Sequence, residues 1–222
     1  RTVSRGLGDV YKRQVLCSFL GMSINMLAFF KGLELSTPVN SSVLITLAPI
    51  LVFIFSALIL KEKIRAMKAV WIIEGFIGAL ILILYTAKSG MNAPNIPLGN
   101  SLFILNSASY GLYLVLIKPM IAKYDIITLL KWLFTIGLII NLPITYNDFI
   151  NINFVALPFY DAILPIVYVI IGTTFFTYLL NAYALKNLTA SSVSSFIYLQ
   201  PIVGIVLSLI HISEPTRHSS SS

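Results

Sequence analysis

Polar side chains stand inside stretches of sequence that are otherwise apolar, and these residues are the best placed to do chemistry. Asparagine, glutamine, threonine and tyrosine exchange hydrogen bonds without carrying a charge, which suits recognition of a small solute in an apolar pocket. The same groups also form interhelical hydrogen bonds in membranes, and the sequence leaves both interpretations open. The candidates are Asn25, Thr46, Asn106, Tyr110, Tyr178, Asn181, Tyr198 and Gln200.

Some of these residues are spaced so that a helix would place them on one face. Asn106 and Tyr110 are four residues apart, and Tyr178 and Asn181 are three apart. Residues at these spacings are neighbours on a helix surface. We therefore expect each pair to face the same side of its helix.

Two charged residues near the ends of apolar stretches are candidates for ion coupling or for contact with a charged solute. Glu74 lies within an apolar segment, where an ionisable side chain usually faces a cavity or the protein interior. It also lies close to Lys68 in sequence and could pair with it. Lys31 could contact an anionic solute, or form a surface ion pair with Glu34 at i+3.

Pro49 and Pro201 each lie inside an apolar run. Proline removes a backbone hydrogen bond and clashes with the preceding helical turn, so each should kink its helix. We interpret the two prolines as paired bends that line a central solute path. Ordinary packing kinks are the alternative.

The residues needed for common enzyme or metal chemistry are missing from the sequence. It has a single cysteine and two histidines, and contains neither a Gly-x-Ser-x-Gly motif nor a phosphate-binding Gly-Lys-Ser/Thr motif. We predict no catalytic residues, no metal site and no cofactor.

The composition indicates a membrane protein. Hydrophobic residues make up 58% of the chain, charged residues 10%, and the mean hydropathy is +0.92. We predict an all-α, polytopic transmembrane helix bundle, with Gly75 and Gly78 at close helix contacts. The seven expected spans are about 15–33, 39–60, 69–85, 98–117, 126–146, 162–185 and one that starts near 190.

Lysine and arginine gather in alternate turns between these spans. Positively charged turns stay on the cytoplasmic side of a membrane, so the turns after spans two, four and six are predicted to be cytoplasmic. Only Lys31 and Lys88 lie on the other side. The residues on the predicted cytoplasmic side are Lys61, Lys63, Arg65, Lys68, Lys118, Lys123, Lys131 and Lys186.

Span two returns as a diverged copy near the C-terminus. LELSTPVNSSVLITLAPILVFI, from Leu33, aligns with LKNLTASSVSSFIYLQPIVGIV, from Leu185, at an offset of 152 residues with seven identities. The copies are five spans apart, and an odd separation reverses their direction in the membrane. The sequence therefore predicts two inverted-topology repeats of five helices each, a pattern found in secondary transporters.

The pattern FFKGLELSTPVNSSVLITLAPILVFIFSALILKEKI and the later NAYALKNLTASSVSSFIYLQPIVGIVLS resemble the EamA-type branch of the drug/metabolite transporter superfamily. The resemblance implies a ten-helix bundle, of which the spans here would be the third to ninth. The charged Glu-Pro pair typical of the family's second half is Gln200-Pro201 in this sequence. No carboxylate function can be carried over to that position.

These observations predict an integral membrane carrier for small organic solutes, working by alternating access at a midplane site. Metabolites such as amino acids or their derivatives, or drugs, are the expected solutes. The resemblance implies a bacterial cytoplasmic (inner) membrane. The expected partners are the solute and the lipid bilayer, with a homodimer left open and no nucleic acid. The alternative is a non-transporting membrane protein, a lipid-interacting or scaffold subunit that retains the fold.

Both ends of the chain look foreign to the rest. Residues 9–14 read DVYKRQ and residues 207–212 read LSLIHI, and one DNA sequence, GATGTGTATAAGAGACAG, encodes the first string directly and the second through its reverse complement. Such paired strings are typical of translated sequencing-library adapters. We therefore predict foreign flanks at 1–14 and 207–222, the end of the first repeat with three spans at 15–86, and the second repeat at 98–206 with its fourth span cut.

The flank hypothesis predicts the outcome of one long continuous DNA read across both junctions. We expect the reading frame to continue, adding about two apolar spans before Val15 and one after Val206, as a ten-helix inverted repeat requires. A native frame that encodes DVYKRQ and LSLIHISEPTR would contradict the hypothesis.

Overall fold

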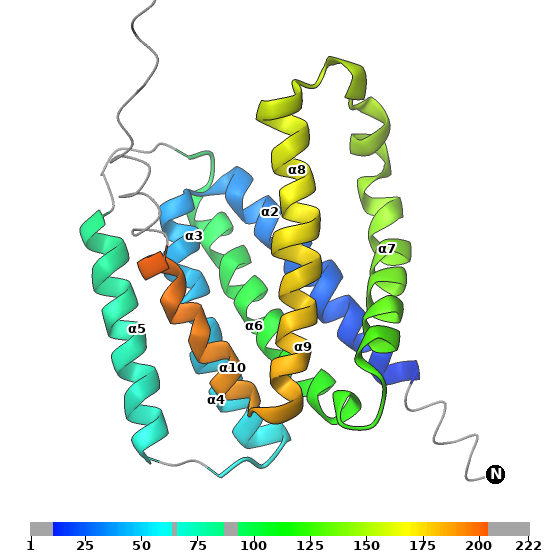
Figure 1. The fold of residues 1–222 in the computed structure, drawn as a ribbon. Helices are drawn as coiled ribbons and strands as arrows, with labels where there is room; N and C mark the ends of the chain where they lie inside the picture. The colour runs from blue at the N-terminus through cyan, green and yellow to red at the C-terminus, as the bar shows by residue number, and fades with distance from the viewer. Residues whose placement is uncertain (1–10, 64–65, 87–92, 204–222) are drawn as a thin grey trace, which may run out of the picture.

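The computed structural model describes residues 11–63, 66–86 and 93–203, and every regular element among them is a helix. In Figure 1 the helices stand side by side as a bundle, with α5 at one edge and α7 at the other. The elements are η1 (Phe19–Ile24), α2 (Asn25–Leu35), α3 (Pro38–Ile45), α4 (Ala48–Ile59), α5 (Ala66–Thr86), α6 (Ile96–Ile121), α7 (Ile126–Asn151), η2 (Phe154–Ala156), η3 (Phe159–Ile163), α8 (Leu164–Tyr168), η4 (Val169–Phe176), α9 (Thr177–Asn187), α10 (Ala190–Ser195) and η5 (Phe196–Leu199).

Five helical stretches among the described residues are long and apolar enough to cross a membrane, and they correspond to predicted spans one, two, four, five and six. The third predicted span is helix α5, and the seventh begins with α10; the part of that predicted span after Val203 lies outside the described residues. The polytopic all-α bundle is therefore confirmed. The crossing stretches are Tyr11–Leu35, Pro38–Ile59, Ile96–Ile121, Ile126–Asn151 and Phe159–Asn187.

Two predicted helix ends were wrong. The first helical stretch already includes Tyr11, inside the predicted foreign flank; residues 1–10 and 204–222 of the two flanks lie outside the described residues. Helix α6 continues past Pro119 to Ile121 instead of ending with the expected span at residue 117. Proline lacks only its own N–H and clashes with the turn before it, so a helix that accommodates Pro119 can continue for the two residues that follow.

Local capping explains where several helices begin. Thr37 accepts a hydrogen bond from the backbone N–H of Asn40 at 3.2 Å, and Asn95 accepts one from Leu98 at 3.2 Å. Asp125 caps α7 through the N–H of Thr128 at 2.9 Å, and this hydrogen bond holds the pKa of its carboxyl below the ordinary value. Each cap satisfies a backbone donor that the first helical turn leaves without a partner.

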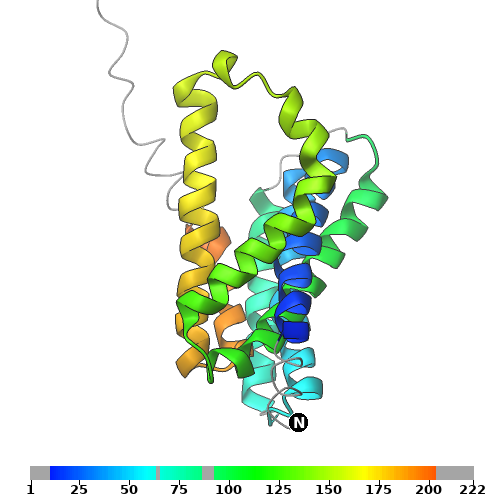
Figure 2. The same cartoon turned by 90° about the vertical axis from the view of Figure 1, so that its right-hand side faces the viewer.

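Helix α6 is the centre of the bundle. It packs against α2, α3, α4, α9, α10 and η1, and its buried side chains Phe103, Tyr113 and Leu114 are among the least exposed in the described chain. Figure 2 shows α7 crossing obliquely in front of α2, and this crossing includes a contact between α7 and η1. The helices around α6 therefore bring Asn25 and Asn181 within hydrogen-bond distance of it.

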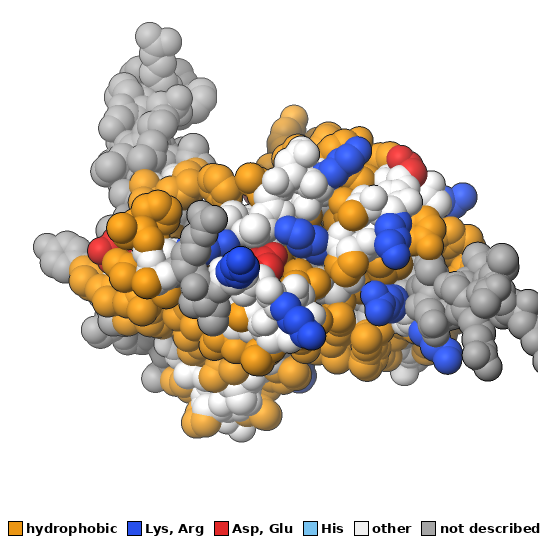
Figure 3. Space-filling model, turned by 90° about the horizontal axis from the view of Figure 1, so that it is seen from below, with side chains coloured by type: hydrophobic (Ala, Val, Ile, Leu, Met, Phe, Trp, Pro, Cys, Tyr) orange, Lys and Arg blue, Asp and Glu red, His pale blue; other side chains and the backbone are white. Residues whose placement is uncertain are grey.

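The basic turns gather at one end of the bundle, at the bottom of Figure 1. Figure 3 looks onto this end and shows lysine and arginine side chains spread across it. The turns that follow α4, α6 and α9 all lie there, as the sequence predicts. Arg65 and Lys88 fall outside the described residues.

The duplication extends to the boundaries of the helices. Helix α2 spans Asn25–Leu35, and α9 spans Thr177–Asn187, which is the same interval shifted by 152 residues. Helices α3 and α10 begin at Pro38 and Ala190, again 152 residues apart. The α3–α4 pair runs toward the basic end and α10 runs away from it, so the two copies are inverted (Figure 1).

Close contacts at glycines hold α2 and α6 together. A Cβ atom on Gly99 would lie 2.5 Å from the Cβ of Ser36 and 2.8 Å from its backbone nitrogen. On α5, a Cβ on Gly75 would lie 2.6 Å from the ring of Tyr198, which confirms a close contact there. The same expectation for Gly78 was wrong, because no described atom comes within 4 Å of the corresponding position.

Substitution of Gly99 by alanine should lower the thermal stability of the bundle. Alanine ordinarily favours a helix by about 1 kcal/mol over glycine, but at Gly99 the added methyl meets the backbone of Ser36, and such overpacking costs about 1–3 kcal/mol. Gly78→Ala is the matched control and should leave stability unchanged or raise it. Thermal unfolding in detergent, followed by circular dichroism, measures both. Equal effects of the two substitutions would contradict the close packing at Gly99.

Candidate functional site

Two of the predicted polar residues on α6 and α9 meet in the middle of the bundle. The side-chain amide of Asn181 donates to the hydroxyl of Tyr110 at 2.9 Å. The hydroxyl of Tyr178, one turn earlier on α9, donates to the backbone carbonyl of Gly21 in η1. Tyr113 lies between them, with its ring centre 5.5 Å from that of Tyr178 and 6.1 Å from that of Tyr110. These contacts join η1, α6 and α9 through one set of tyrosines.

A second polar contact joins α2 to α6. Asn106 donates from its side-chain amide to the carbonyl of Asn25 at 2.8 Å, and Asn25 donates back to the carbonyl of Asn106 at 3.2 Å. Ser109, one turn along, also donates to the carbonyl of Asn106 at 3.0 Å. The interhelical interpretation accounts for both amide groups of this pair. Their place on a solute path remains a prediction.

π-helical turns position the tyrosine contact. The segments η1 and η4 each lead directly into an α-helix, and residues 19–24 of η1 map onto residues 171–176 of η4 at the 152-residue offset. π-helical turns within longer helices often accompany functional sites. Gly21 lies in η1, and Tyr178 is the second residue of α9, directly after η4, so their hydrogen bond ties η1 to the helix that follows its repeat equivalent.

Gly21 lets the aromatic side chains approach η1. A Cβ atom at this position would lie 2.6 Å from a ring carbon of Tyr113. Tyr113 is 1% exposed and cannot move aside without disturbing the packing around Tyr178. The glycine therefore sets how closely the first repeat approaches the centre of the bundle.

The two duplicated segments are both interrupted before their proline. Helix α3 ends at Ile45 and α4 resumes at Ala48, which makes Pro49 the second residue of the new helix. In the second copy the α-helix ends at Ser195, a 3₁₀ turn follows, and helix resumes at Gln200 with Pro201 second. Each expected bend is thus a short break of 3₁₀ type between two helical segments, with each proline at a position where a missing N–H is tolerated.

Hydroxyl groups add hydrogen bonds to the backbone carbonyls at these interruptions, beside the backbone N–H groups of Thr46 and Leu47. The side chain of Thr46 donates to the carbonyl of Val43 at 2.6 Å, and Ser107 of α6 donates to the carbonyl of Leu44 at 3.1 Å. In the second copy, Ser194 and Ser195 both donate to the carbonyl of Ser191. Thr46 is therefore engaged in supporting the break. Gln200 is exposed, and the buried hydroxyl of Tyr198 has no hydrogen-bond partner among the described residues.

The two charged candidates lie away from this interior cluster. Lys31 and Glu34 form an ion pair at 2.8 Å with side chains 57% and 63% exposed, as the surface interpretation predicts. Glu74 is exposed on α5, a helix that contacts the rest of the described bundle through α3, α4 and η5. Neither residue is brought to the tyrosine–asparagine contacts, and their coupling roles remain predictions.

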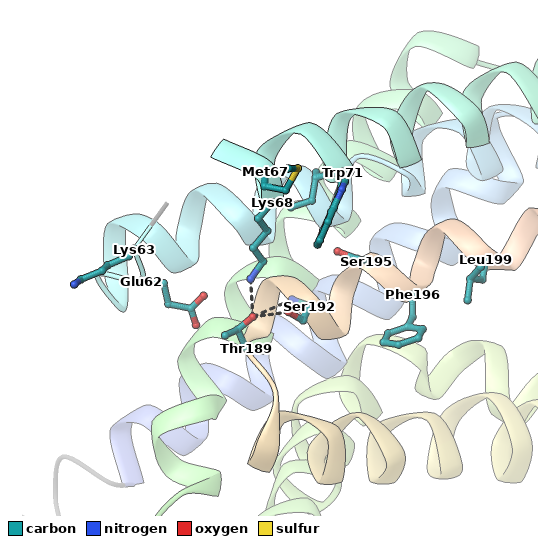
Figure 4. A pocket seen from close by; sticks show the side chains of 11 residues that line it. Glu62, Lys63, Met67, Lys68, Trp71, Thr189, Ser192, Ser195, Phe196 and Leu199 are labelled. Carbon is teal, nitrogen blue, oxygen red and sulfur yellow. Dashed lines mark hydrogen bonds between the residues drawn. The ribbon is translucent and has the colours of Figure 1, made fainter. Parts of the chain in front are cut away.

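The basic end holds a polar cluster that the sequence alone did not reveal. Lys118 at the end of α6 lies 3.6 Å from the carboxylate of Glu62 and donates to the carbonyl of Leu188 at 2.7 Å. Lys68 of α5 donates to the hydroxyl of Thr189 at 2.7 Å (Figure 4). These contacts tie the α4–α5 connection, the end of α6 and the start of α10 together. The one available signal was that Thr189 is the repeat equivalent of Thr37.

Among the described residues, no group of three or more histidine, cysteine, aspartate or glutamate side chains is arranged to hold a metal ion. The interior polar groups are amides and hydroxyls, which donate and accept hydrogen bonds and are poor nucleophiles without an activating base. The arrangement is suited to binding and to helix association.

Comparison with known protein families identifies the family to which this sequence belongs. The sequence model of the EamA-like transporter family matches residues 4–84 and 97–219. The chain belongs to the EamA-like transporter family. With its several apolar helices, it is an integral, multi-pass membrane protein.

Relatives of this EamA-like chain occur in archaea and bacteria. One uncharacterized transporter of Archaeoglobus fulgidus is 31% identical over 175 residues, covering 79% of this chain and 59% of the relative, and a second is 23% identical, covering 96% and 72%. The uncharacterized transporter YyaM of Bacillus subtilis is 24% identical, covering 81% of this chain and 59% of the relative. The chain thus spans 59% of the length of the first relative.

The bundle also resembles a solved structure, described as the crystal structure of a protein. The TM-score is 0.71 at 17% sequence identity, and the match covers 97% of this chain and 75% of the other. At this identity the likeness concerns the fold alone. It confirms the polytopic helical bundle.

Removing the hydroxyl of Tyr178 should weaken the contact between the repeats. Tyr178→Phe leaves the carbonyl of Gly21 without this donor, at a cost of about 1 kcal/mol. The control is Tyr183→Phe on the same helix, where the side chain is 49% exposed. Thermal unfolding in detergent should show a lower midpoint for Tyr178→Phe alone. Unchanged midpoints for both variants would mean that the bond adds nothing to stability.

Proposed function

We propose that the protein moves small organic solutes across the membrane by alternating access at a midplane site between its two inverted repeats. Metabolites such as amino acids or their derivatives, or drugs, are the solute class that the family resemblance favours. The observation that carries this proposal is the pair of interrupted helices. Each repeat has one, the two run in opposite directions, and they pack against each other. Helix α10 of the second copy contacts α4 of the first.

Interrupted helices suit a carrier for a physical reason. At an interruption the backbone loses its regular hydrogen bonds, and in a membrane this is tolerated only where protein groups or a water-lined cavity satisfy the backbone. The hydroxyls of Thr46, Ser107 and Ser194 add to the remaining backbone bonds to give that support here. A helix supported in this way can bend at the break without exposing its backbone to lipid. The two breaks are therefore the proposed hinges.

The neutral polar cluster supports a solute path lined by hydrogen-bonding groups. The amide of Asn181 and the hydroxyl of Tyr110 bond to each other across α6 and α9, and they could exchange this bond for one to a solute. Tyr198 carries a buried hydroxyl with no partner among the described residues, on the segment that contains the second break. Such groups within an apolar bundle are what a small-solute site requires.

Solute counterflow tests the proposal. The complete coding sequence, read from the source DNA, is reconstituted into proteoliposomes preloaded with unlabelled solutes, and uptake of the labelled solute is measured across a broad metabolite panel. We expect uptake for at least one solute. The absence of protein-dependent uptake for every solute would overturn the carrier proposal in favour of a non-transporting membrane protein.

Once a solute is known, the hinge can be tested by replacing Pro49. Pro49→Ala allows the break between α3 and α4 to close into a continuous helix, and we expect counterflow to slow by about tenfold, equivalent to about 1.4 kcal/mol in the barrier. Pro97→Ala is the control, since Pro97 also occupies the second position of its helix but lies at the start of α6, where no interruption exists. Equal rates for the two variants would exclude the break as a hinge.

A further inference from the structure

Helix α6 is contacted at both of its ends by the duplicated segments, and the chemistry of the two contacts differs. Near the start of α6, Asn100 accepts a hydrogen bond at 2.8 Å from the hydroxyl of Ser36, in the turn before α3. Near its end, Lys118 donates at 2.7 Å to the carbonyl of Leu188, in the turn before α10. Ser36 and Leu188 are 152 residues apart and are therefore equivalent in the repeat. The first contact is neutral, and the second involves a charged side chain.

The charged contact joins the two repeats. The ammonium of Lys118, in the second repeat, lies 3.6 Å from the carboxylate of Glu62, in the α4–α5 connection of the first repeat. The hydroxyl of Ser191 on α10 donates to the same carboxylate at 3.4 Å. Beside them, Lys68 of α5 donates to the hydroxyl of Thr189 at 2.7 Å (Figure 4). Glu62 therefore contacts both α6 and α10 across the boundary between the repeats.

The turn before Glu62 has an unusual backbone. Lys61 has a φ of 54°, in the left-handed region that residues other than glycine seldom adopt, and no other described non-glycine residue has a positive φ. The N–H of Glu62 then donates back to the carbonyl of Ser56 at 3.3 Å, which ties Glu62 to the end of α4. Such a backbone persists only where its surroundings hold it in place. The position of Glu62 is therefore fixed by the main chain as well as by its side-chain partners.

The Glu62–Lys118 pair is more shielded from solvent than an ordinary surface ion pair. The side chains of Lys118 and Glu62 are 26% and 20% exposed, whereas those of Lys31 and Glu34 are 57% and 63% exposed. Exposed ion pairs contribute little to stability, while removing one partner of a shielded pair leaves a charge without compensation. Lys31 and Glu34 are also three residues apart on one helix. Of these two ion pairs, only Glu62–Lys118 joins the repeats.

Apolar side chains from both repeats lie deeper in the bundle at this end. Ala190 and Val193 of α10 are buried in the same cluster as Val52 of α4 and Ile117 of α6. Helix α10 begins here and leads into the second interruption, which is one of the proposed hinges. Movement of α10 away from α4 at this end would therefore break the contact between α10 and Glu62.

We infer that Glu62 and Lys118, with the hydrogen bonds to Leu188 and from Ser191, form a gate that closes the basic end of the boundary between the two repeats. The gate holds the start of α10 against the α4–α5 connection, and its opening admits water to the buried residues of α10 behind it. As a gate for a solute it rests on the proposed transport function. Its closure is measured without any solute.

Thiol labelling from the basic side tests this closure. Val193→Cys places a thiol behind the gate in the protein encoded by the complete coding sequence, and Cys17→Ser, with serine at any cysteine outside this sequence, leaves it as the only thiol. Membrane vesicles that expose the basic end are treated with a charged, membrane-impermeant thiol reagent. We expect Glu62→Gln to speed labelling about five- to tenfold, because the charge of Lys118 loses its partner. Unchanged labelling would overturn the gate, whether or not transport is found.

Two controls separate a gate from a general loosening of the bundle. Ala28 is buried in α2 toward the opposite end, and labelling of Ala28→Cys from either side of the membrane should stay slow when Glu62→Gln is added. Glu34→Gln breaks the other ion pair and should leave labelling of Val193→Cys unchanged. Faster labelling of both thiols in Glu62→Gln, or an equal effect of Glu34→Gln, would indicate a general loss of stability and would overturn the gate.

A double-variant cycle tests whether Glu62 and Lys118 act as one unit. Glu62→Gln with Lys118→Gln removes both charges and leaves neither without a partner, so we expect labelling no faster than in the faster single variant. Independent contributions would multiply the two single-variant effects and would overturn the pair as the closing contact. If counterflow finds no solute while Glu62→Gln still speeds labelling, the closure stands and only the transport proposal is overturned.

Discussion

The need to satisfy backbone hydrogen bonds in lipid governs this structure. A transmembrane helix that is interrupted must find partners for its freed carbonyls within the protein, because hydrocarbon offers none. Here tightened backbone bonds and hydroxyl side chains share this role: the N–H groups of Thr46 and Leu47 bond to the carbonyls of Val43 and Leu44, and the hydroxyls of Thr46 and Ser107 add a second bond to each. The serine- and threonine-rich runs that precede both prolines are thus part of the interruptions themselves. Helix α6, at the centre of the bundle, donates one of these bonds through Ser107.

The two duplicated segments begin at opposite ends of the bundle, each with a threonine that caps its first helix, but the surroundings of the two threonines differ. Thr37 caps its helix through Asn40, and Thr189 caps its own through Ser192. Thr189 additionally accepts from Lys68, because the second copy begins at the basic end. The inversion therefore gives identical local folds different electrostatic neighbours. Positive charge therefore collects around the start of α10, where Lys68 and Lys118 both donate hydrogen bonds.

Hydropathy and the repeat were enough to predict the helices, their direction and the position of the basic turns, because these features depend on residue type and order alone. The partners of the interior polar residues were not predictable. Asn106 and Tyr110 share a helix face as expected, yet one bonds to α2 and the other to α9. The π-helical turns also escaped prediction, since no residue type marks a five-residue hydrogen-bond spacing. The contact of Lys68 with Thr189 spans 121 residues of sequence, which only the fold brings together.

The polar contacts in the interior of the bundle are neutral, whereas the ion pairs lie near its ends, and this difference affects how easily the two repeats can move relative to each other. The contacts that tie η1, α6 and α9 together are hydrogen bonds between neutral groups, worth about 1 kcal/mol each in a membrane. The ion pairs found among the described residues, Lys31 with Glu34 and Lys118 with Glu62, lie near the two ends of the bundle. Breaking a buried ion pair would cost about 3–5 kcal/mol, since it leaves a charge without a partner. Because its interior polar contacts are neutral pairs instead, separating the two repeats at the centre would break no interior ion pair among the described residues, and the main cost would be the packing of the apolar core that the repeats share.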